Sequence, residues 1–320
     1  MSWLKGIREE GNIMVKSGVN FLGNVYGVGG GGAEKFIGRT FYQDYTNGSN
    51  NNSGDHARAA KKTLQACLDL CEDKRGDKIV VGGGYAELVS EPMEVTKEGI
   101  TIAAAVFGIA PGFQRWSGGY QATDASAMAS SPILTLSKPT RLAGLAFGAY
   151  DNTDPGGSAA PRGAAVLING DGATVTGDYC HIVGCHFRNP FTSTTMLYNF
   201  SSQGNIIEHN VFDGWGKTAC GYGFGAGSIT QVGEFIVRYN YFYDCDKGIR
   251  HYTGAPPQGW IHGNHFMDCA TDCIDTNGGS GVVSVTDNWY DGANTAVYET
   301  TLTTGKIGTW CFSGNHYLES

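Results

Sequence analysis

Charged residues are scarce in this sequence. Asp, Glu, Lys and Arg make up 16% of the 320 residues, against about 25% in an average globular protein. Lys and Arg form no cluster anywhere in the chain, and the net charge is −8. This balance argues against a nucleic-acid-binding surface, so we expect no nucleic-acid partner. The chain also lacks a run of about 18 apolar residues, so we expect no insertion into a membrane.

The first residues lack the features of a secretory signal peptide. The segment "MSWLKGIREEGNIMV" contains no apolar core followed by a small-residue cleavage site. The nine cysteines are an odd number, which excludes a framework in which every cysteine is paired. We therefore expect reduced, buried thiols in a protein assembled in a cytosol. His and Cys do not gather at metal-ligand spacing, and the sequence predicts neither a cofactor nor a metal site from these residue types.

Glycine, by contrast, is abundant, and a short phrase of Asn, one further residue and an aromatic recurs along the chain. Glycine accounts for 49 of the 320 residues, about twice its usual share. The aromatic anchors of the phrase are Phe187, Phe212, Phe242, Phe266, Tyr290 and Tyr317. The steps between them are 25, 30, 24, 24 and 27 residues, and a looser copy ends at Phe147. Such self-similarity is typical of architectures built from stacked units.

Each phrase follows a short segment in which apolar residues alternate with more polar ones. Five positions before the anchors lie Ile182, Ile207, Val237, Ile261, Val285 and Phe312. Alternation with a period of two predicts strands. A second strand is expected after each phrase, most clearly at Ile249, Ile274 and Val297. Repeats of this kind predict coils stacked at the ordinary strand spacing of about 4.8 Å.

Stacked coils bring equivalent residues into columns. The asparagine column comprises Asn210, Asn240, Asn264, Asn288 and Asn315, and Cys185 replaces asparagine in the first copy. Asparagine tolerates a left-handed backbone and bonds to neighbouring peptide groups, which suits a corner. Stacked amides also bond from coil to coil. We therefore interpret the phrase as a corner that occurs once in each coil, and predict an asparagine ladder along it.

In these features the sequence resembles the right-handed parallel β-helix proteins of the pectate-lyase-like group, which carry asparagine ladders at their turns. The resemblance implies an all-β fold, a right-handed single-stranded parallel β-helix. It says less about function, because many activities share this fold.

A second resemblance concerns "GRTFYQDYTNGSNNNSGD" and the following "ARAAKKTLQACLDLCEDKRGDKIVVGGGYAE". Together they are similar to the opening segment of many phage and bacterial β-helix proteins. We expect a strand at 40–42, a capping helix at about 55–72 and a first rung at 77–81. The helix has an apolar stripe at Leu64, Cys67, Leu68 and Cys71. The two resemblances cover about residues 38–320, which we predict to be one parallel β-helix domain.

Residues 1–37 differ from the rest. The stretch "VYGVGGGGAEKF" is a glycine-rich joint, and no β-helix phrase precedes it. A short piece tied on by glycines suggests an anchor to another body. We interpret residues 1–37 as a segment that anchors the protein to other virion proteins.

Binding and chemistry are expected on an outer sheet face. If Ile249, Ile274 and Val297 point inward, then Arg250, Asp275 and Tyr298 point outward, with Tyr252 on the same side. Aromatic faces beside hydrogen-bonding groups suit a glycan, so these four residues are the predicted glycan-binding residues. The alternative is that the tyrosines, which include Tyr198 and Tyr222, pack against a neighbouring subunit or loop.

Asp244 and Asp268 occupy the same place after two successive anchors, with Asp246 and Asp272 nearby. A stacked carboxylate pair would suit the acid and base of a glycosidase, so Asp244 and Asp268 are the tentative catalytic residues. Two alternatives stay open, a Ca²⁺ site and plain turn chemistry at the corner. The outward column of Glu208, Arg238 and His262 is interpreted as a surface charge ladder.

The favoured function is that of a phage virion protein. It would be a tailspike or receptor-binding protein that contacts host surface polysaccharide, assembled in the host cytoplasm and located in the virion. The resemblance implies a homotrimer. Two alternatives remain: a structural capsid or tail decoration (cement) protein, and a polysaccharide lyase or glycoside hydrolase.

Overall fold

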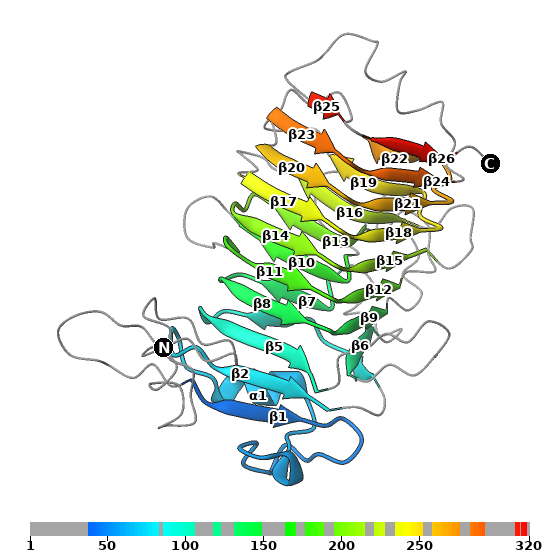
Figure 1. Cartoon of the computed structure of the whole chain (residues 1–320). Helices are drawn as coiled ribbons and strands as arrows, with labels where there is room; N and C mark the ends of the chain where they lie inside the picture. Colours follow the sequence, from blue (N-terminus) through cyan, green and yellow to red (C-terminus); the bar gives the residue numbers. More distant parts are fainter. Residues whose placement is uncertain are drawn as a thin grey trace, which may run out of the picture.

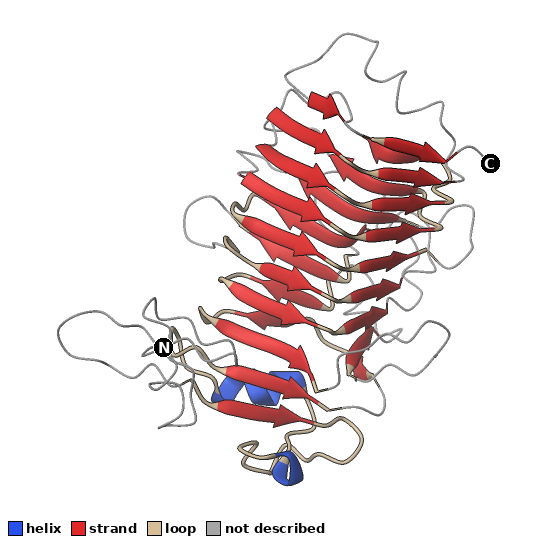
Figure 2. Cartoon of the chain, viewed as in Figure 1, coloured by secondary structure: helices blue, strands red, loops and turns tan. Residues whose placement is uncertain are grey.

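The computed structural model describes residues 38–82, 86–105, 118–122, 131–148, 164–170, 177–188, 195–214, 221–227, 234–251, 258–275, 282–291, 311–313 and 315–318. Within them the chain forms two short helices and 26 strands. The strands wind around a single column (Figure 1), and the helices lie at its N-terminal end (Figure 2). The predicted anchor at 1–37 lies outside the described residues.

Three sheets run along the column. The first sheet contains β1 (Thr40–Gln43), β2 (Lys78–Val81), β5 (Ile100–Ala104), β8 (Thr140–Ala143), β11 (His181–Val183), β14 (Asn205–Glu208), β17 (Glu234–Arg238), β20 (Gln258–His262), β23 (Val282–Thr286) and β25 (Cys311–Ser313). The second sheet contains β3 (Glu87–Val89), β6 (Gly119–Ala122), β9 (Ala146–Gly148), β12 (His186–Arg188), β15 (Val211–Asp213), β18 (Tyr241–Tyr243), β21 (His265–Met267), β24 (Trp289–Asp291) and β26 (His316–Leu318). The third sheet contains β4 (Met93–Val95), β7 (Leu134–Leu136), β10 (Val166–Asn169), β13 (Thr195–Phe200), β16 (Tyr222–Gly227), β19 (Lys247–His251) and β22 (Asp272–Asp275).

One coil passes through all three sheets before the chain returns to the first. In β17, β18 and β19, for example, the chain visits the first, second and third sheets, and β20 then pairs in parallel with β17. In Figure 1 the first sheet faces the viewer, and the third lies behind it. Parallel strands joined in this way coil right-handedly. The chain is therefore a right-handed parallel β-helix of the pectate-lyase-like kind, which confirms the predicted fold class.

The aromatic anchors form a continuous stack inside the column. The rings of Phe147, Phe187, Phe212, Phe242, Phe266 and Tyr290 follow one another with centroid distances of 5.3, 5.0, 4.7, 4.9 and 5.3 Å. The five phenylalanines are completely buried. This spacing follows the distance between neighbouring strands, so one ring per coil fills the core without a gap. Each stacked pair contributes about 0.5–1.5 kcal/mol beyond its burial.

The asparagine ladder lies beside this stack, at the corner between the first and second sheets. Asn264 Oδ1 accepts hydrogen bonds from both the backbone N–H and the Nδ2 of Asn240, each at 3.0 Å. Its own Nδ2 donates to the carbonyl of Val237 at 2.9 Å. The same pattern recurs along the whole predicted column of Asn210, Asn240, Asn264, Asn288 and Asn315. Cys185 continues the column through its N–H, which donates to Asn210 Oδ1 at 2.8 Å.

The expectation that asparagine itself adopts the left-handed conformation is wrong. The residue before each of the first four asparagines has the positive φ: His209 at 55°, Tyr239 at 55°, Gly263 at 61° and Asp287 at 55°. The asparagine is needed instead for its buried amide, which in the interior of the ladder makes four hydrogen bonds at once, as Asn264 does. The left-handed residue turns the chain, and the asparagine satisfies the polar groups that this turn leaves inside.

The N-terminal end of the column is closed by helix α1 (Leu64–Leu70), which is shorter than the predicted 55–72. A single 3-10 turn, η1 (Ala57–Ala59), precedes it. Lys61 lies between them in an extended backbone, because its N–H and carbonyl bond to Tyr42 and Asp44 beside β1. The helix therefore starts only after Thr63, whose hydroxyl caps it. The predicted apolar stripe of Leu64, Cys67, Leu68 and Cys71 is buried as expected.

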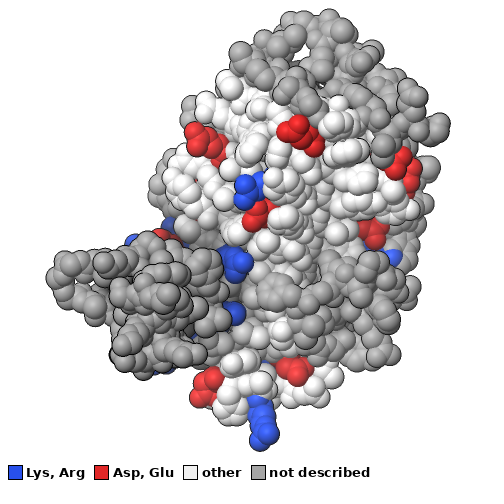
Figure 3. Space-filling model, viewed as in Figure 1, with Lys and Arg blue, Asp and Glu red and all other residues white. Residues whose placement is uncertain are grey.

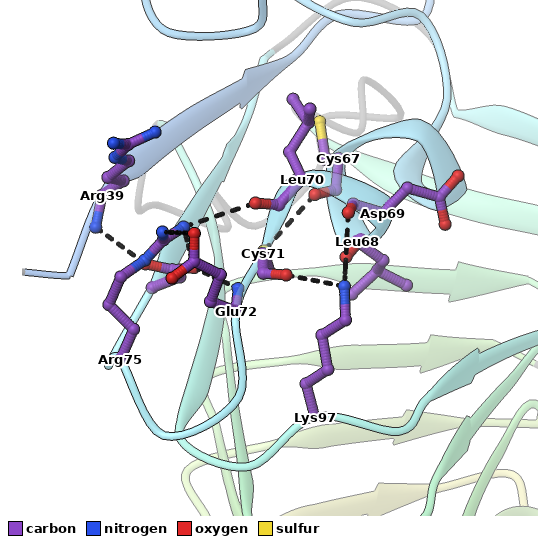
Figure 4. Close-up of polar contacts among 10 residues, drawn as sticks. Arg39, Cys67, Leu68, Asp69, Leu70, Cys71, Glu72, Arg75 and Lys97 are labelled. Carbon is purple, nitrogen blue, oxygen red and sulfur yellow. Dashed lines mark hydrogen bonds and ion pairs between the residues drawn. The ribbon is translucent and has the colours of Figure 1, made fainter.

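Two charged side chains fasten the end of this helix to the first rungs (Figure 4). Lys97 Nζ donates to the carbonyls of Leu68 and Cys71 at 2.8 and 2.6 Å. Asp77 is fully buried and accepts from the N–H groups of Arg39 and Glu72, both at 2.8 Å. Burial alone would raise the pKa of Asp77, but these bonds and the Arg75 guanidinium hold it below its ordinary value. These bonds explain why the first rung begins with an aspartate, since a side chain without two acceptor oxygens could not make them.

A buried carboxylate holds the other end of the helix. Glu87 Oε2 accepts from the N–H of Leu64 at 2.9 Å and from Nε2 of Gln43 at 2.5 Å. Tyr120 donates to Oε1 of the same Gln43 at 2.8 Å. Burial raises the pKa of Glu87 to about 7, against the lowering effect of these two donors. The cap therefore contains a carboxyl group that titrates near neutral pH.

The cysteines in the described part of the chain are free and buried. Burial raises the pKa of Cys67, Cys71, Cys180 and Cys185 to about 12. These four thiols are therefore protonated at neutral pH and act as small core side chains. Among the helices described, none has the length and apolar character needed to cross a membrane.

Candidate functional site

The third sheet brings the predicted outward residues together on adjacent strands. Val166, Leu197, Phe224, Ile249 and Ile274 are aligned in register and are all buried in the core. The next position on each strand therefore points outward. In this column Arg250 on β19 pairs directly with Asp275 on β22. The register argument made from the sequence is correct for these two residues.

Arg250 is held by an aromatic ring and a carboxylate. Its guanidinium carbon lies 4.5 Å from the centroid of the Tyr222 ring on β16. Its Nε is 3.7 Å from Oδ2 of Asp275. A cation over an aromatic face contributes about 0.5–2 kcal/mol, depending on how far both groups are removed from water. The arginine is thus fixed in place above the sheet before any ligand binds.

Lys247 adds a second cation, which sequence reasoning did not identify. Its Nζ lies 2.6 Å from Oδ2 of Asp275 and 2.6 Å from Oδ2 of Asp272. Burial alone would lower the pKa of Lys247, but the bonds to the two aspartates outweigh this effect and raise the pKa above its ordinary value, so the amine stays charged. Burial raises the pKa of Asp272, whose side chain is only 7% exposed. No sequence pattern marks Lys247, because its role depends on strand register.

A small apolar cluster lies on the same outer face, next to the charged group. Leu167, Tyr198 and Ala164 are buried together outside the main core, and Phe200 packs against them. The rings of Tyr198 and Phe200 stack at 6.1 Å. Tyr198 is only 8% exposed, so the expected row of outward tyrosines open to a ligand is wrong at this position. Gly225 separates Tyr198 from Arg250 in the column and places no side chain between them.

The other two predicted glycan-binding residues, Tyr252 and Tyr298, lie outside the described residues. The described part of the face therefore contains Tyr222, Lys247, Arg250, Asp272 and Asp275, which we call the third-sheet site. It combines one aromatic ring with two cations and two carboxylates, whose charges compensate one another. Such a group orients hydroxyl-rich ligands through hydrogen bonds while the ring supplies flat apolar area.

The tentative catalytic pair lies at the corner between the second and third sheets. Asp244 and Asp268 have φ values of 51° and 52°, and their N–H groups donate to the carbonyls of Met267 and Asp291. Aspartate tolerates this left-handed geometry, which is what the turn alternative requires. The side chain of Asp268 is exposed. The structure therefore gives both residues a place in the turn, whereas the carboxylates that enter the ion-paired network are Asp272 and Asp275.

The column of Glu208, Arg238 and His262 is aligned on the first sheet as predicted. Only its first two members form a charge pair, with Arg238 Nε 2.7 Å from Glu208 Oε2. His262 bonds to Tyr239 and Thr286 instead. Across the described residues, no group of three or more His, Cys, Asp or Glu side chains is arranged to hold a metal ion.

Comparison with known proteins yields likeness only among solved structures, since no family model and no curated protein matches the chain. Alginate lyase from Paenibacillus sp. str. FPU-7 is 12% identical, with a TM-score of 0.49 over 88% of this chain and 96% of that chain. Pectate lyase Pel9A is 14% identical, with a TM-score of 0.46 over 88% and 78%. The deglycosylated pectin methylesterase from Aspergillus niger is 11% identical, with a TM-score of 0.41 over 88% and 93%. The activities in these names are those of the other proteins, and the fold assignment stands on the three sheets described above.

Proposed function

We propose that this β-helix binds a polysaccharide across the third-sheet site. The observation that carries the proposal is the fixed position of Arg250 over the Tyr222 ring, one strand away from Asp275 and beside Lys247. A sugar ring needs flat apolar area together with donors and acceptors whose directions are already set. Because these side chains hold one another in place, little ordering entropy is lost when a ligand binds.

The setting that we propose is a phage virion, where the protein acts as a tailspike or receptor-binding protein on host surface polysaccharide. Support comes from the sequence: the glycine-rich joint after residue 26 and the opening segment that is similar to phage β-helix proteins. In this proposal residues 1–37 attach the chain to other virion proteins, and three copies form a homotrimer. Light scattering tests the trimer, and a monomer mass at micromolar concentration contradicts it.

Deletion of residues 1–37 tests the anchor. The shortened chain should keep the far-ultraviolet circular dichroism of the β-helix, because β1 begins at Thr40. It should be missing from purified virions if the segment is the attachment point. Truncated protein that still co-purifies with virions contradicts this part of the proposal.

Substitutions on the third sheet test the binding face. Tyr222→Ala and Arg250→Ala should each weaken the binding free energy for alginate, polygalacturonate or host surface polysaccharide by about 1–2 kcal/mol. The retardation of the protein in native gels that contain these polymers measures this change. Lys78→Ala on β2, whose side chain is exposed on another sheet, is the control. Unchanged binding in both site variants would favour the cement-protein alternative, in which this face is a protein interface.

Cleavage of the polysaccharide is tested separately. The lyase or hydrolase alternative requires new reducing ends or unsaturated products when the protein is incubated with a bound polysaccharide. If they form, Asp272→Asn should abolish them, because Asp272 is a carboxylate of the third-sheet site whose pKa is raised by burial. If only Asp268→Asn abolishes the products, the catalytic carboxylates are instead Asp244 and Asp268.

A further inference from the structure

A second aromatic surface lies on the outer face of the first sheet, away from the third-sheet site. Trp260 on β20 is 37% exposed, and Tyr239, at the end of β17, is 46% exposed. His262 lies between them on β20 and touches both rings. We call Tyr239, Trp260 and His262 the Trp260 platform. Large rings left in contact with water side by side mark a place where something binds.

The rings of the platform are fixed from below and from the sides. Trp260 stacks on His262 with a centroid distance of 4.6 Å, and its Nε1 donates to Thr286 Oγ1 at 3.0 Å. The Tyr239 ring lies over the backbone of Gly263, where a Cβ atom would come within 2.7 Å of it. A larger residue at Gly263 would displace the ring. Because these side chains are already positioned, little conformational entropy is lost when a ligand binds to them.

The hydrogen bonds of the platform leave one hydrogen-bonding position on the Tyr239 hydroxyl for a ligand. The Thr286 hydroxyl oxygen accepts from Trp260, so its single hydrogen is available to Nδ1 of His262, 3.0 Å away. His262 then carries its hydrogen on Nε2 and donates to the Tyr239 hydroxyl at 3.2 Å. A protonated His262, whose Nδ1 lies 3.3 Å from Asp287, donates in the same direction. In these two states the Tyr239 O–H hydrogen remains for an outside acceptor. When the single hydrogen of His262 lies on Nδ1, the Tyr239 hydroxyl donates to Nε2 and its oxygen accepts from a ligand hydroxyl instead.

Charge at the platform is compensated. Arg238, the arginine next to Tyr239, is bound by Glu208 through its Nε and Nη2 at 2.7 and 2.6 Å. The other oxygen of Glu208 is 2.9 Å from His181. Figure 3 shows that most of the described surface on this side carries no charged side chain. Nucleic acids also stack on aromatic rings, but they need a positively charged track beside them. A neutral ligand with flat apolar faces and hydroxyl groups fits better.

We propose that the Trp260 platform is a second carbohydrate-binding site, and that it takes a neutral hexose polysaccharide. A sugar ring stacks on Trp260, and a sugar hydroxyl bonds to the hydroxyl of Tyr239, whose ring is itself held between His209 and the backbone of Gly263. This goes beyond the function proposed above, because binding here uses neither Arg250 nor Asp275.

Native gels that contain galactomannan, dextran or hydroxyethyl cellulose test the proposal on the full chain. At least one of these neutral polymers should retard the protein. Trp260→Ala should reduce the association constant by about tenfold or more, as expected for an aromatic anchor. Tyr239→Phe, which keeps the ring and removes the donor, should reduce it by about threefold to tenfold, the loss of one hydrogen bond.

Trp289→Ala is the matched control, because Trp289 is another exposed tryptophan, at 44%, on β24 of the second sheet. It should leave the retardation by the neutral polymers unchanged, as should Lys78→Ala, whose side chain is exposed on β2. The proposal fails if none of the three polymers retards the wild type, or if Trp289→Ala has the same effect as Trp260→Ala. It also fails if Trp260→Ala instead lowers the oligomeric mass and leaves the retardation unchanged, since the face is then a contact between copies.

Discussion

Replacing Asn264, in the interior of the asparagine ladder, with leucine should strongly destabilise the column. The Asn264 side chain is completely buried, with ladder partners on both sides. Its loss removes the acceptor of two donors on Asn240, the backbone N–H and one Nδ2 hydrogen. It also removes the donor to the Val237 carbonyl. The Asn264 N–H keeps its own bond to Asn288 Oδ1, so that bond does not enter the sum.

The expected loss of stability follows from the two donors of Asn240 that no longer have an acceptor. Each buried donor left without a partner costs about 1–3 kcal/mol, so the substitution should lower the free energy of unfolding by about 2–6 kcal/mol. That is a large part of the total stability of a typical domain, which is about 5–15 kcal/mol. Urea denaturation followed by far-ultraviolet circular dichroism measures it.

Asn315→Leu is the control for this prediction. Asn315 makes the same bonds to Asn288 and Val285, but it ends the described ladder and is only half-buried. Water can replace its amide there, so the loss should be about 1 kcal/mol. Equal losses for Asn264→Leu and Asn315→Leu, or a loss below about 1 kcal/mol for Asn264→Leu, would refute the reasoning.

Three further changes test other parts of the structure. The pKa of Glu87 is raised to about 7 from an ordinary 4.5, so the contribution of this group to stability is fully present below about pH 4.5 and is lost as pH rises through 7. From pH 5 to pH 8 this loss should be about 2–3 kcal/mol, and urea denaturation of Glu87→Gln should not show it. Gly263→Ala should lower the melting temperature and galactomannan binding together, because a Cβ would meet the Tyr239 ring, whereas Gly184→Ala has a similar positive φ but an open Cβ position and should affect only stability. Asp77→Ala should lower the free energy of unfolding in urea by about 3–5 kcal/mol, because it removes a fully buried carboxylate that Arg75 and the N–H groups of Arg39 and Glu72 all bind.

Periodicity was a sufficient guide to the architecture. Spacing alone placed the anchors, the inward positions and the asparagine column, because each coil must bury the same positions as its neighbours. It also placed Arg250 and Asp275 on one outer face, since a strand sends successive side chains to opposite sides. The helix bounds were less well predicted, because the chain around Lys61 is held extended by β1, a contact between segments distant in sequence.

The sequence by itself determined which residues repeat, and therefore the coil, its core stack and its ladder. Only the tertiary structure decided which outward side chains meet. Lys247 joins Asp272 and Asp275, 25 and 28 residues further along, because β19 and β22 are paired in a particular register. Trp260 meets Thr286 for the same reason. Outward residues are free of the packing constraint that makes inward ones periodic, so nothing in the pattern of the chain marks their partners.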